Sequence, residues 1–190
     1  MAHPAVKNYI TAQEYLEQER AATEKHEYYQ GEVFAMSGAR LQHNRIQMNF
    51  TGEARIRLRG KSCEVFGSDL RVHIPANTLF TYPDAVIVCG KPELLDEAFD
   101  TLLNPVVIVE ILSRSTQSYD RGDKFMLYRA IPSLKEYVMI DSESIGIEHY
   151  SRQEDGTWLF AETKDPASVL QLLSLGISFP ISLLYEGVEL

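Results

Sequence analysis

The sequence predicts an α/β (α+β) protein in which helices flank a central mixed β-sheet. Three β-branched apolar runs, bounded by Gly, Pro or Asn, predict the central strands at Cys63 to Ile74, Tyr82 to Cys89 and Val106 to Leu112. The third run begins without alternation, which is typical of a strand covered on both faces. Helical and hairpin patterns surround these runs without a repeat or a linker, so we expect one domain over residues 1–190.

Two short elements are expected before the central strands. Thr11 and Glu14 form a capping-box pattern that predicts a peripheral helix over Ala12 to Arg20. After it, Glu27 to Tyr29 and Glu32 to Met36 flank a Gln-Gly pair, and glycine at the second turn position favours a two-residue β-hairpin. An N-terminal helix and a β-hairpin therefore precede the expected core.

The segment from Ala39 to Gly60 fits two interpretations. Apolar residues recur every four positions, which is the spacing of one helix face, at Ile46, Phe50, Ala54 and Leu58. Alternating apolar residues instead fit a pair of strands, at Ile46, Met48 and Phe50 and at Ala54, Ile56 and Leu58. A helix is the favoured interpretation.

The region after the third run begins with a helix. Ser118 is the expected N-cap of a helix over Tyr119 to Ala130, which carries Asp120 and Asp123 in its first turns and ends before Pro132. Polar turns then separate the extra C-terminal strands, and an apolar tail follows: Glu136 to Ile140, Ile145 to Tyr150, Thr157 to Glu162 and the tail Val169 to Leu184.

The composition narrows the class of protein. A net charge of −9 argues against a broadly basic nucleic-acid coat, so local charge matters more than the total. Cys63 and Cys89 lie among apolar or small residues without a CxxC spacing, and we expect them to be reduced, buried thiols of a cytoplasmic protein. The sequence shows no leader pattern and no apolar stretch near the roughly 20 residues that a membrane-spanning helix needs.

One segment is basic within this acidic chain. Between Arg40 and Lys61 the only acidic residue is Glu53, and the basic residues are Arg40, Arg45, Arg55, Arg57, Arg59 and Lys61. This segment fits contact with a phosphate backbone, and it fits equally well a solvated helix face that carries arginines for solubility.

Two carboxylates interrupt the central apolar runs. Asp84 follows Pro83 at the start of one run, and Glu110 lies inside the next. A buried carboxylate loses several kcal/mol of hydration unless it is paired, protonated or bound to a metal. Oxygen ligands from two neighbouring strands suit a hard cation such as Mg²⁺ or Mn²⁺ better than zinc.

The order of these residues resembles a nuclease signature. Pro83-Asp84, then Glu110-Ile111-Leu112, then a helix with Lys124 resembles the Pro-Asp and Glu-x-Lys motifs of the PD-(D/E)XK superfamily. The segment Val106 to Thr116, with Tyr119-Asp-Arg-Gly-Asp-Lys and Tyr128, is similar to the Uma family of restriction-endonuclease-type proteins, as are Gly31-Glu32, Met36, His43 and Ser68-Asp69. This resemblance implies a restriction-endonuclease-like core.

The sequence departs from the superfamily signature at Leu112, where a lysine normally stands. In the Uma family the following helix supplies this lysine, which implies Lys124 here. Lys124 shares a helix face with Tyr128 and Ile131, so a face that packs on the sheet also directs the amine to the sheet's rim. Arg114 stands where the family usually has proline, and we expect only a difference in the loop.

The resemblance implies a Mg²⁺-dependent endonuclease that hydrolyses DNA phosphodiester bonds, with Mn²⁺ as a possible substitute. Asp84, Glu110 and the backbone carbonyl of Ile111 are the expected metal ligands, and Lys124 is expected to position the nucleophile and neutralise developing charge. His43 is a fourth catalytic candidate, at the attacking water, the phosphate or a carboxylate. Glu32 and Asp69 are candidates for a supporting role around the site or for extra metal ligands.

Other interpretations of these residues stay open. Asp84 fits a turn residue after proline, Lys124 a surface lysine paired along its helix with Asp120 or Asp123, and His43 a helix histidine with a structural partner. A catalytically inactive nucleic-acid-binding or regulatory protein is the main alternative function, and an enzyme acting on a small phosphoester is another. A homodimer is expected for double-strand cleavage, with the apolar tail as a pairing surface.

Overall fold

A mixed six-stranded β-sheet organises the fold, as the sequence predicts. The computed structural model describes residues 9–114 and 117–190. Within these residues the strand order is β11-β10-β9-β8-β6-β3, with β8 parallel to β9 and the other neighbours antiparallel. The strands are β3 (Cys63–Gly67), β6 (Ala85–Cys89), β8 (Val107–Leu112), β9 (Glu136–Asp141), β10 (Ile147–Arg152) and β11 (Trp158–Thr163).

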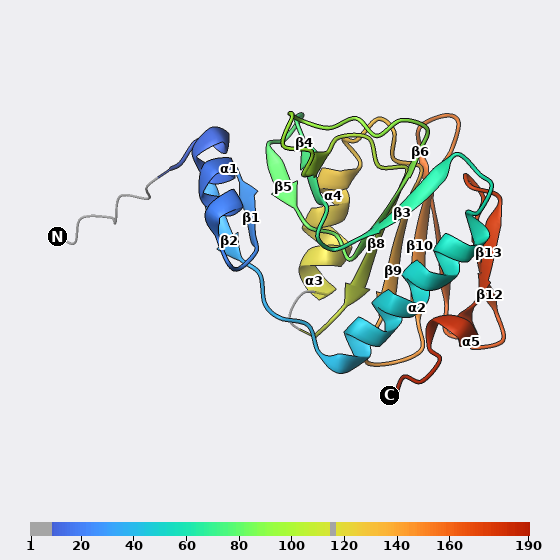
Figure 1. The fold of residues 1–190 in the computed structure, drawn as a ribbon. Helices are drawn as coiled ribbons and strands as arrows, with labels where there is room; N and C mark the ends of the chain where they lie inside the picture. The colour runs from blue at the N-terminus through green and yellow to red at the C-terminus, as the bar shows by residue number, and fades with distance from the viewer. Residues whose placement is uncertain (1–8, 115–116) are drawn as a thin grey trace.

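A second sheet joins the N-terminal hairpin to the body of the molecule (Figure 1). Its order is β2-β1-β5-β4-β7, formed by β1 (His26–Tyr29), β2 (Glu32–Ala35), β4 (Arg71–Ile74), β5 (Leu79–Thr81) and β7 (Thr101–Leu102). Helix α1 (Ala12–Ala21) packs on this sheet, where Tyr15 stacks on Tyr28 with ring centroids 5.1 Å apart. The predicted N-terminal helix, its capping box and the β-hairpin are confirmed.

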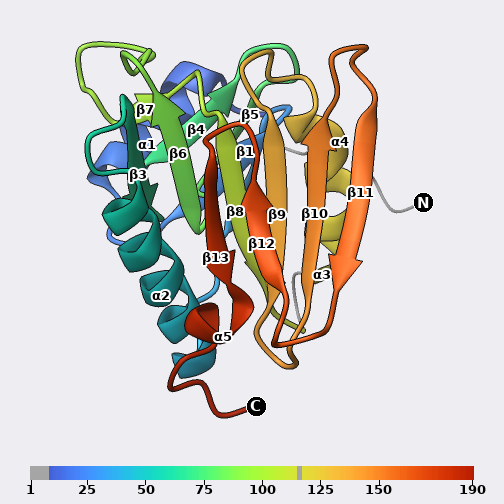
Figure 2. The same cartoon turned by 90° about the vertical axis from the view of Figure 1, so that its right-hand side faces the viewer.

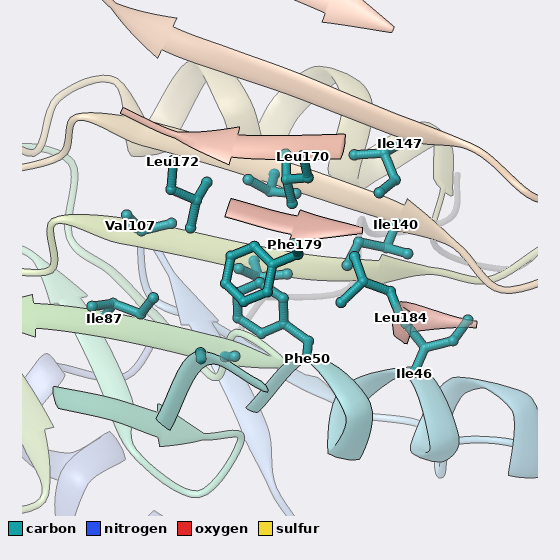
Figure 3. Packing of buried hydrophobic residues seen from close by; sticks show 14 of the residues in the cluster. Ile46, Phe50, Ile87, Val107, Ile140, Ile147, Leu170, Leu172, Phe179 and Leu184 are labelled. Carbon is teal, nitrogen blue, oxygen red and sulfur yellow. The ribbon is translucent and has the colours of Figure 1, made fainter. Parts of the chain in front are cut away.

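One face of the six-stranded sheet carries the larger apolar core. Figure 2 shows this face covered by α2 (Leu41–Arg57), the hairpin of β12 (Val169–Leu172) and β13 (Ile177–Pro180), and α5 (Ile181–Leu184). Phe50 of α2 lies against Phe179, with ring centroids 5.3 Å apart (Figure 3). The residues of α2 at four-residue spacing are the buried ones, so the helix is confirmed and the pair of strands is wrong.

The opposite face of the sheet receives a short helical segment. It consists of α3 (Gln117–Tyr119), a π-helical turn η1 (Asp120–Lys124) and α4 (Phe125–Tyr128). Side chains alternate along β8, so Val109 and Ile111 face the larger core while Ile108 and Leu112 face this segment. The same alternation directs Glu110 toward the helical segment.

Two predictions of local structure are wrong. Ser118 lies inside α3 and is no N-cap, because helical hydrogen bonding has already begun where the Gln117 amide donates to the Ser113 carbonyl (3.0 Å). The run from Cys63 to Ile74 forms two strands in different sheets, because the chain turns after Gly67, where the Leu70 amide donates to the Gly67 carbonyl (3.3 Å).

The prediction of reduced cysteines is also wrong, because Cys63 and Cys89 are joined by a disulfide. The two residues are direct partners in the antiparallel pairing of β3 with β6, with their Cα atoms 4.0 Å apart. Their sequence separation of 26 residues hides this pairing from pattern analysis, because strand register is a tertiary property.

The C-terminal tail belongs to the chain's own core. Leu170, Leu172, Phe179 and Ile181 are buried against the six-stranded sheet. The tail is therefore not the free apolar surface on which the dimer hypothesis relied, and the homodimer itself stays a prediction. Among the described residues, no helix has the length and apolar character needed to cross a membrane.

Candidate active site

Asp84, directly before β6, lies beside Glu110 of the neighbouring strand β8. Ala85 of β6 pairs with Val109 of β8, and continuing this antiparallel register by one residue places Asp84 opposite Glu110. Asp84 is held by the backbone of β8, because the Ile111 amide donates to its Oδ2 atom at 2.7 Å. The two predicted carboxylates therefore meet in the structure.

Lys124 reaches the same place from the helical segment. Its Nζ atom lies 3.1 Å from Glu110 Oε1, 3.1 Å from Glu27 Oε1 and 3.3 Å from Asp120 Oδ1. Tyr128, one helical turn further on, donates its hydroxyl to Glu110 Oε1 at 2.7 Å. The shared helix face of Lys124 and Tyr128, predicted from their spacing, thus closes over Glu110.

A π-helical turn sets this geometry. Residues Asp120–Lys124 form η1, whose first residue is anchored where the Tyr137 hydroxyl donates to the Asp120 carbonyl at 3.0 Å. π-helical turns are rare and occur frequently at functional sites. Asp120 and Lys124 are both buried within this turn, so the pairing along the helix anticipated from sequence is present for Asp120.

His43 contributes from α2. Its Nε2 atom lies 3.1 Å from Asp84 Oδ2, and its side chain is half-buried in the helix turn that precedes Ile46. Gln47, one turn further along, donates to the Asp84 carbonyl at 2.7 Å. Of the positions considered for His43, the structure therefore shows it beside a carboxylate of the site.

Burial governs the ionisation of the central residues. Burial raises the pKa of Glu110, the Lys124 ammonium opposes this rise, and the charges of Asp120 and Asp84 add to it. Burial alone lowers the pKa of Lys124, but Glu110, Glu27 and Asp120 together raise it well above its ordinary value. The lysine therefore remains a cation among carboxylates.

These side chains line one open cleft of about 720 Å³. The N-terminal hairpin, the start of α2, the ends of β6 and β8 and the helical segment all contribute to its walls, through residues that include Glu27, His43, Asp84, Glu110, Tyr119 and Lys124. A cleft in which several titratable groups converge is the usual form of an active site.

Comparison with known proteins identifies the family. Residues 12–182 match the Uma2 family, whose description reads "Putative restriction endonuclease". The chain belongs to the Uma2 family. Two proteins of Synechocystis sp., both named as uncharacterized, are similar to it: one is 35% identical over 179 residues, covering 94% of this chain and 93% of the relative, and the other is 37% identical over 158 residues, covering 83% and 89%.

A solved structure shares the fold of this Uma2 chain. The crystal structure described as a "putative nuclease belonging to DUF820" from Anabaena variabilis matches with a TM-score of 0.76 at 17% sequence identity, covering 93% of this chain and 98% of that chain. At this identity the similarity establishes the fold alone. The predicted restriction-endonuclease-like core is confirmed.

Two acidic candidates lie away from the centre of the Uma2 site. Asp69 occupies the turn after β3, where its side chain is 96% exposed and pairs with Lys25 at 2.6 Å. Glu32 lies on β2 and is not among the residues that line the cleft. The carboxylate that the N-terminal hairpin brings to Lys124 is Glu27, on the neighbouring strand β1.

Sequence reasoning missed Glu27, Asp120 and Tyr128 as members of the site. A signal for Glu27 exists in its strand, because alternation along β1 places it on the face opposite Tyr28, which packs with α1. Asp120 and Tyr128 lie four residues before and four residues after Lys124. The helix face that carries the lysine therefore carries its partners as well.

The donor set of the Uma2 site fits a hard divalent cation. Within residues 9–114 and 117–190 no group of three or more His, Cys, Asp or Glu is arranged to hold a metal ion. Mg²⁺ does not need such a group, because it is commonly held by one or two carboxylates, with water and substrate phosphate completing its shell. Asp84 and Glu110 both face the cleft and supply that minimum.

Proposed function

We propose that this Uma2 protein is a Mg²⁺-dependent endonuclease that hydrolyses DNA phosphodiester bonds. One observation carries the proposal: Asp84 and Glu110 lie opposite each other on adjacent strands, with Lys124 bonded to Glu110 (3.1 Å), in an open cleft of a restriction-endonuclease-like fold. This combination of two carboxylates and a lysine matches what metal-assisted phosphodiester hydrolysis requires.

Asp84 and Glu110 would hold the cation, together with the Ile111 carbonyl and water. When bound, Mg²⁺ supplies a coordinated water of lowered pKa and positive charge beside the phosphate. Mn²⁺ offers the same oxygen-based coordination. The chain prepares these ligands in advance, since the Ile111 amide and His43 hold Asp84 while Tyr128 and Lys124 hold Glu110.

Lys124 would position the attacking water and neutralise negative charge that develops on the phosphate. Its ammonium has three N–H donors, and the surrounding carboxylates keep it charged although burial opposes the charge. His43 acts by orienting Asp84, because its Nε2 atom lies 3.1 Å from the carboxylate oxygen that also accepts the Ile111 amide.

A catalytically inactive DNA-binding or regulatory protein is the second candidate. One observation favours it: three carboxylates lie within 3.3 Å of Lys124 Nζ, so its donors are already engaged inside the chain. Leu112 also occupies the position where the superfamily signature has its lysine. Salt-sensitive DNA binding without cleavage would support this candidate over the first.

The test is cleavage of supercoiled and linear DNA with Mg²⁺ or Mn²⁺. Wild type is compared with Asp84→Ala, Glu110→Ala and Lys124→Ala, and Glu154→Ala serves as the matched control because Glu154 is an exposed acid outside the cleft. We expect metal-dependent nicking by wild type and the control, and its loss in the three site variants. Folded wild type that binds DNA but never cuts it would overturn the proposal.

The proposal includes a homodimer, because two paired chains would place two active centres on one duplex for cleavage of both strands. Sedimentation at micromolar concentration, with and without a DNA duplex, measures this. A chain that stays monomeric in both conditions would contradict the homodimer.

A further inference from the structure

Two exposed arginines flank the mouth of the cleft from different loops. Arg40 lies at the start of α2 and Arg114 follows β8, and both line the cleft. They meet at Glu143, in the turn between β9 and β10. Arg40 NH1 lies 3.9 Å from Glu143 Oε1, and Arg114 Nε lies 3.9 Å from Glu143 Oε2. One carboxylate is thus held between two guanidinium groups.

These contacts are loose compared with the structural ion pairs of the same protein. The side chains of Arg40 and Arg114 are 79% and 84% exposed. Arg121, in contrast, approaches Glu148 to 2.7 Å with its side chain 36% exposed. Exposed ion pairs at such distances contribute little stability, so the Glu143 contacts are easily exchanged.

The arrangement suits a phosphodiester. A carboxylate and a phosphodiester each carry one negative charge shared between two oxygens, and guanidinium groups bind both. The start of α2 adds to the positive potential, because Arg40 is its N-cap without a side-chain cap and the first turn contains no acidic residue. Glu143 therefore occupies a position that fits a backbone phosphate.

We propose that Arg40 and Arg114 together bind one backbone phosphate of DNA beside the scissile bond, and that Glu143 fills this phosphate site until DNA displaces it. The proposal rests on the proposed function, because it assigns the substrate contact of the same cleft. It also gives two roles to the arginines of the basic segment. Arg40 contacts DNA, whereas Arg57 pairs with Glu53 and donates to the Ser178 carbonyl (2.5 Å) within the fold.

The test measures DNA binding apart from cleavage. Binding of a fluorescent duplex is followed by anisotropy in EDTA between 50 and 200 mM salt, a range over which phosphate contacts weaken strongly. We expect Arg40→Ala and Arg114→Ala each to weaken binding about three- to tenfold and to reduce the slope of log K against log salt by about 1. Arg55→Ala and Arg59→Ala are matched controls, because both residues are exposed and neither lines the cleft.

The variant of Glu143 gives the sharper result. Glu143→Gln is expected to strengthen DNA binding about threefold or more, because the competing carboxylate is removed from between the arginines. Glu154→Gln controls for net charge, since Glu154 is an exposed acid outside the cleft. In the triple variant with Arg40→Ala and Arg114→Ala, the gain from Glu143→Gln is expected to disappear.

Three outcomes would overturn this inference: Glu143→Gln matching Glu154→Gln, its gain surviving in the triple variant, or Arg55→Ala weakening binding as much as Arg40→Ala. Each failure is distinguishable from failure of the proposed function. Binding that follows the expected pattern without any cleavage would reject the endonuclease and keep the phosphate site. DNA cleavage without the expected pattern of binding would keep the endonuclease and reject the phosphate site.

Discussion

Two buried cations in this protein have different surroundings. Arg71 is 2% exposed, and its guanidinium donates to Thr101 (3.0 Å) and Tyr82 (2.9 Å) and pairs with Asp100 (3.0 Å). Lys124 is 6% exposed and lies among three carboxylates, those of Glu27, Glu110 and Asp120. The arginine is matched by hydroxyls and an acid, whereas the lysine is outnumbered by acids.

The difference separates a structural ion pair from a site prepared for chemistry. Burying charge is tolerated when an opposite charge balances it and hydrogen bonds engage its donors; Arg71 has one acid, Asp100, and donates from two of its three guanidinium nitrogens. Around Lys124 the acids outnumber the cation: burial raises the pKa of Glu110, and the charges of Asp120 and Asp84 add to this rise although the Lys124 ammonium opposes it. This imbalance, in an open cleft, distinguishes the candidate active site from the rest of the polar interior.

The largest expected effect concerns activity. Glu110→Gln removes one ligand charge while keeping the size of the side chain, and we expect the cleavage rate to fall by about 10³-fold or more. Arg71→Met should leave the rate per folded molecule within about twofold. Single-turnover rates, scaled by the folded fraction from circular dichroism, measure both. Equal losses in the two variants would remove the distinction between the cations.

The free energy of unfolding should fall more in Arg71→Met than in Glu110→Gln. Arg71→Met removes a buried ion pair and two hydrogen bonds, but Asp100 keeps Arg20 and the Tyr82 hydroxyl keeps Glu19 as a partner, so the free energy of unfolding should fall by about 2–3 kcal/mol. Urea unfolding measures it. Lys164→Met is the control, because the exposed pair of Lys164 and Glu162 should contribute little to the free energy of unfolding. A small loss for Arg71→Met would show that its network is not a stabilising one.

A divalent cation should stabilise the fold by binding at the site around Lys124, and not by binding at the Arg71 network. At 100 times its dissociation constant Mg²⁺ adds about 2.7 kcal/mol to the free energy of unfolding, and the Tm of a chain of this size should rise by roughly 5–10 °C. Asp84→Ala should lose this shift and Asp100→Asn should keep it. Differential scanning fluorimetry with Mg²⁺ against EDTA provides the measurement. A shift that persists in Asp84→Ala would place the cation elsewhere.

The smallest expected effect is the pH dependence of the stability contributed by Asp100, the acid that pairs with Arg71. Hydrogen bonds from Arg20 hold the pKa of Asp100 below its ordinary value, with Thr101 and the charge of Arg71 adding to this. A lowered folded-state pKa stabilises the fold above the ordinary pKa of about 3.9, and this stabilisation is lost as the pH falls below it. Asp100→Asn should therefore lower the free energy of unfolding by about 1 kcal/mol at pH 7, and by less at pH 3. Urea midpoints between pH 2 and pH 7 test this, and a difference that grows toward low pH would contradict it.

The elements that follow strong periodicities could be predicted from the sequence. The four-residue spacing from Ile46 to Leu58 predicts α2. The interruption of two apolar runs by carboxylates predicts Asp84 and Glu110 as site residues, and these two residues meet in the structure. Lys124 needed the family resemblance, because an isolated helix lysine has no pattern that marks it as buried.

Features that depend on strand register or on tertiary approach could not be predicted. The pairing of Cys63 with Cys89 follows from the alignment of β3 with β6, and the approach of Glu27 to Lys124 follows from the docking of one sheet against a helix. The π-helical turn is equally hidden, because its sequence Asp-Arg-Gly-Asp-Lys also fits an ordinary helix. The missed features of the site are therefore long-range ones.

The N-terminal helix and hairpin share a small core with β5, formed by Tyr15, Leu16, Tyr28 and Phe80. This aromatic cluster, the pairing of β1 with β5 and the hydrogen bond that the Thr81 hydroxyl donates to Glu27 hold one of the three acids around Lys124 in place. The acid that the hairpin brings to Lys124 is therefore positioned by elements outside the six-stranded sheet, so a change in this small core would alter the charge around the lysine without a substitution in the cleft.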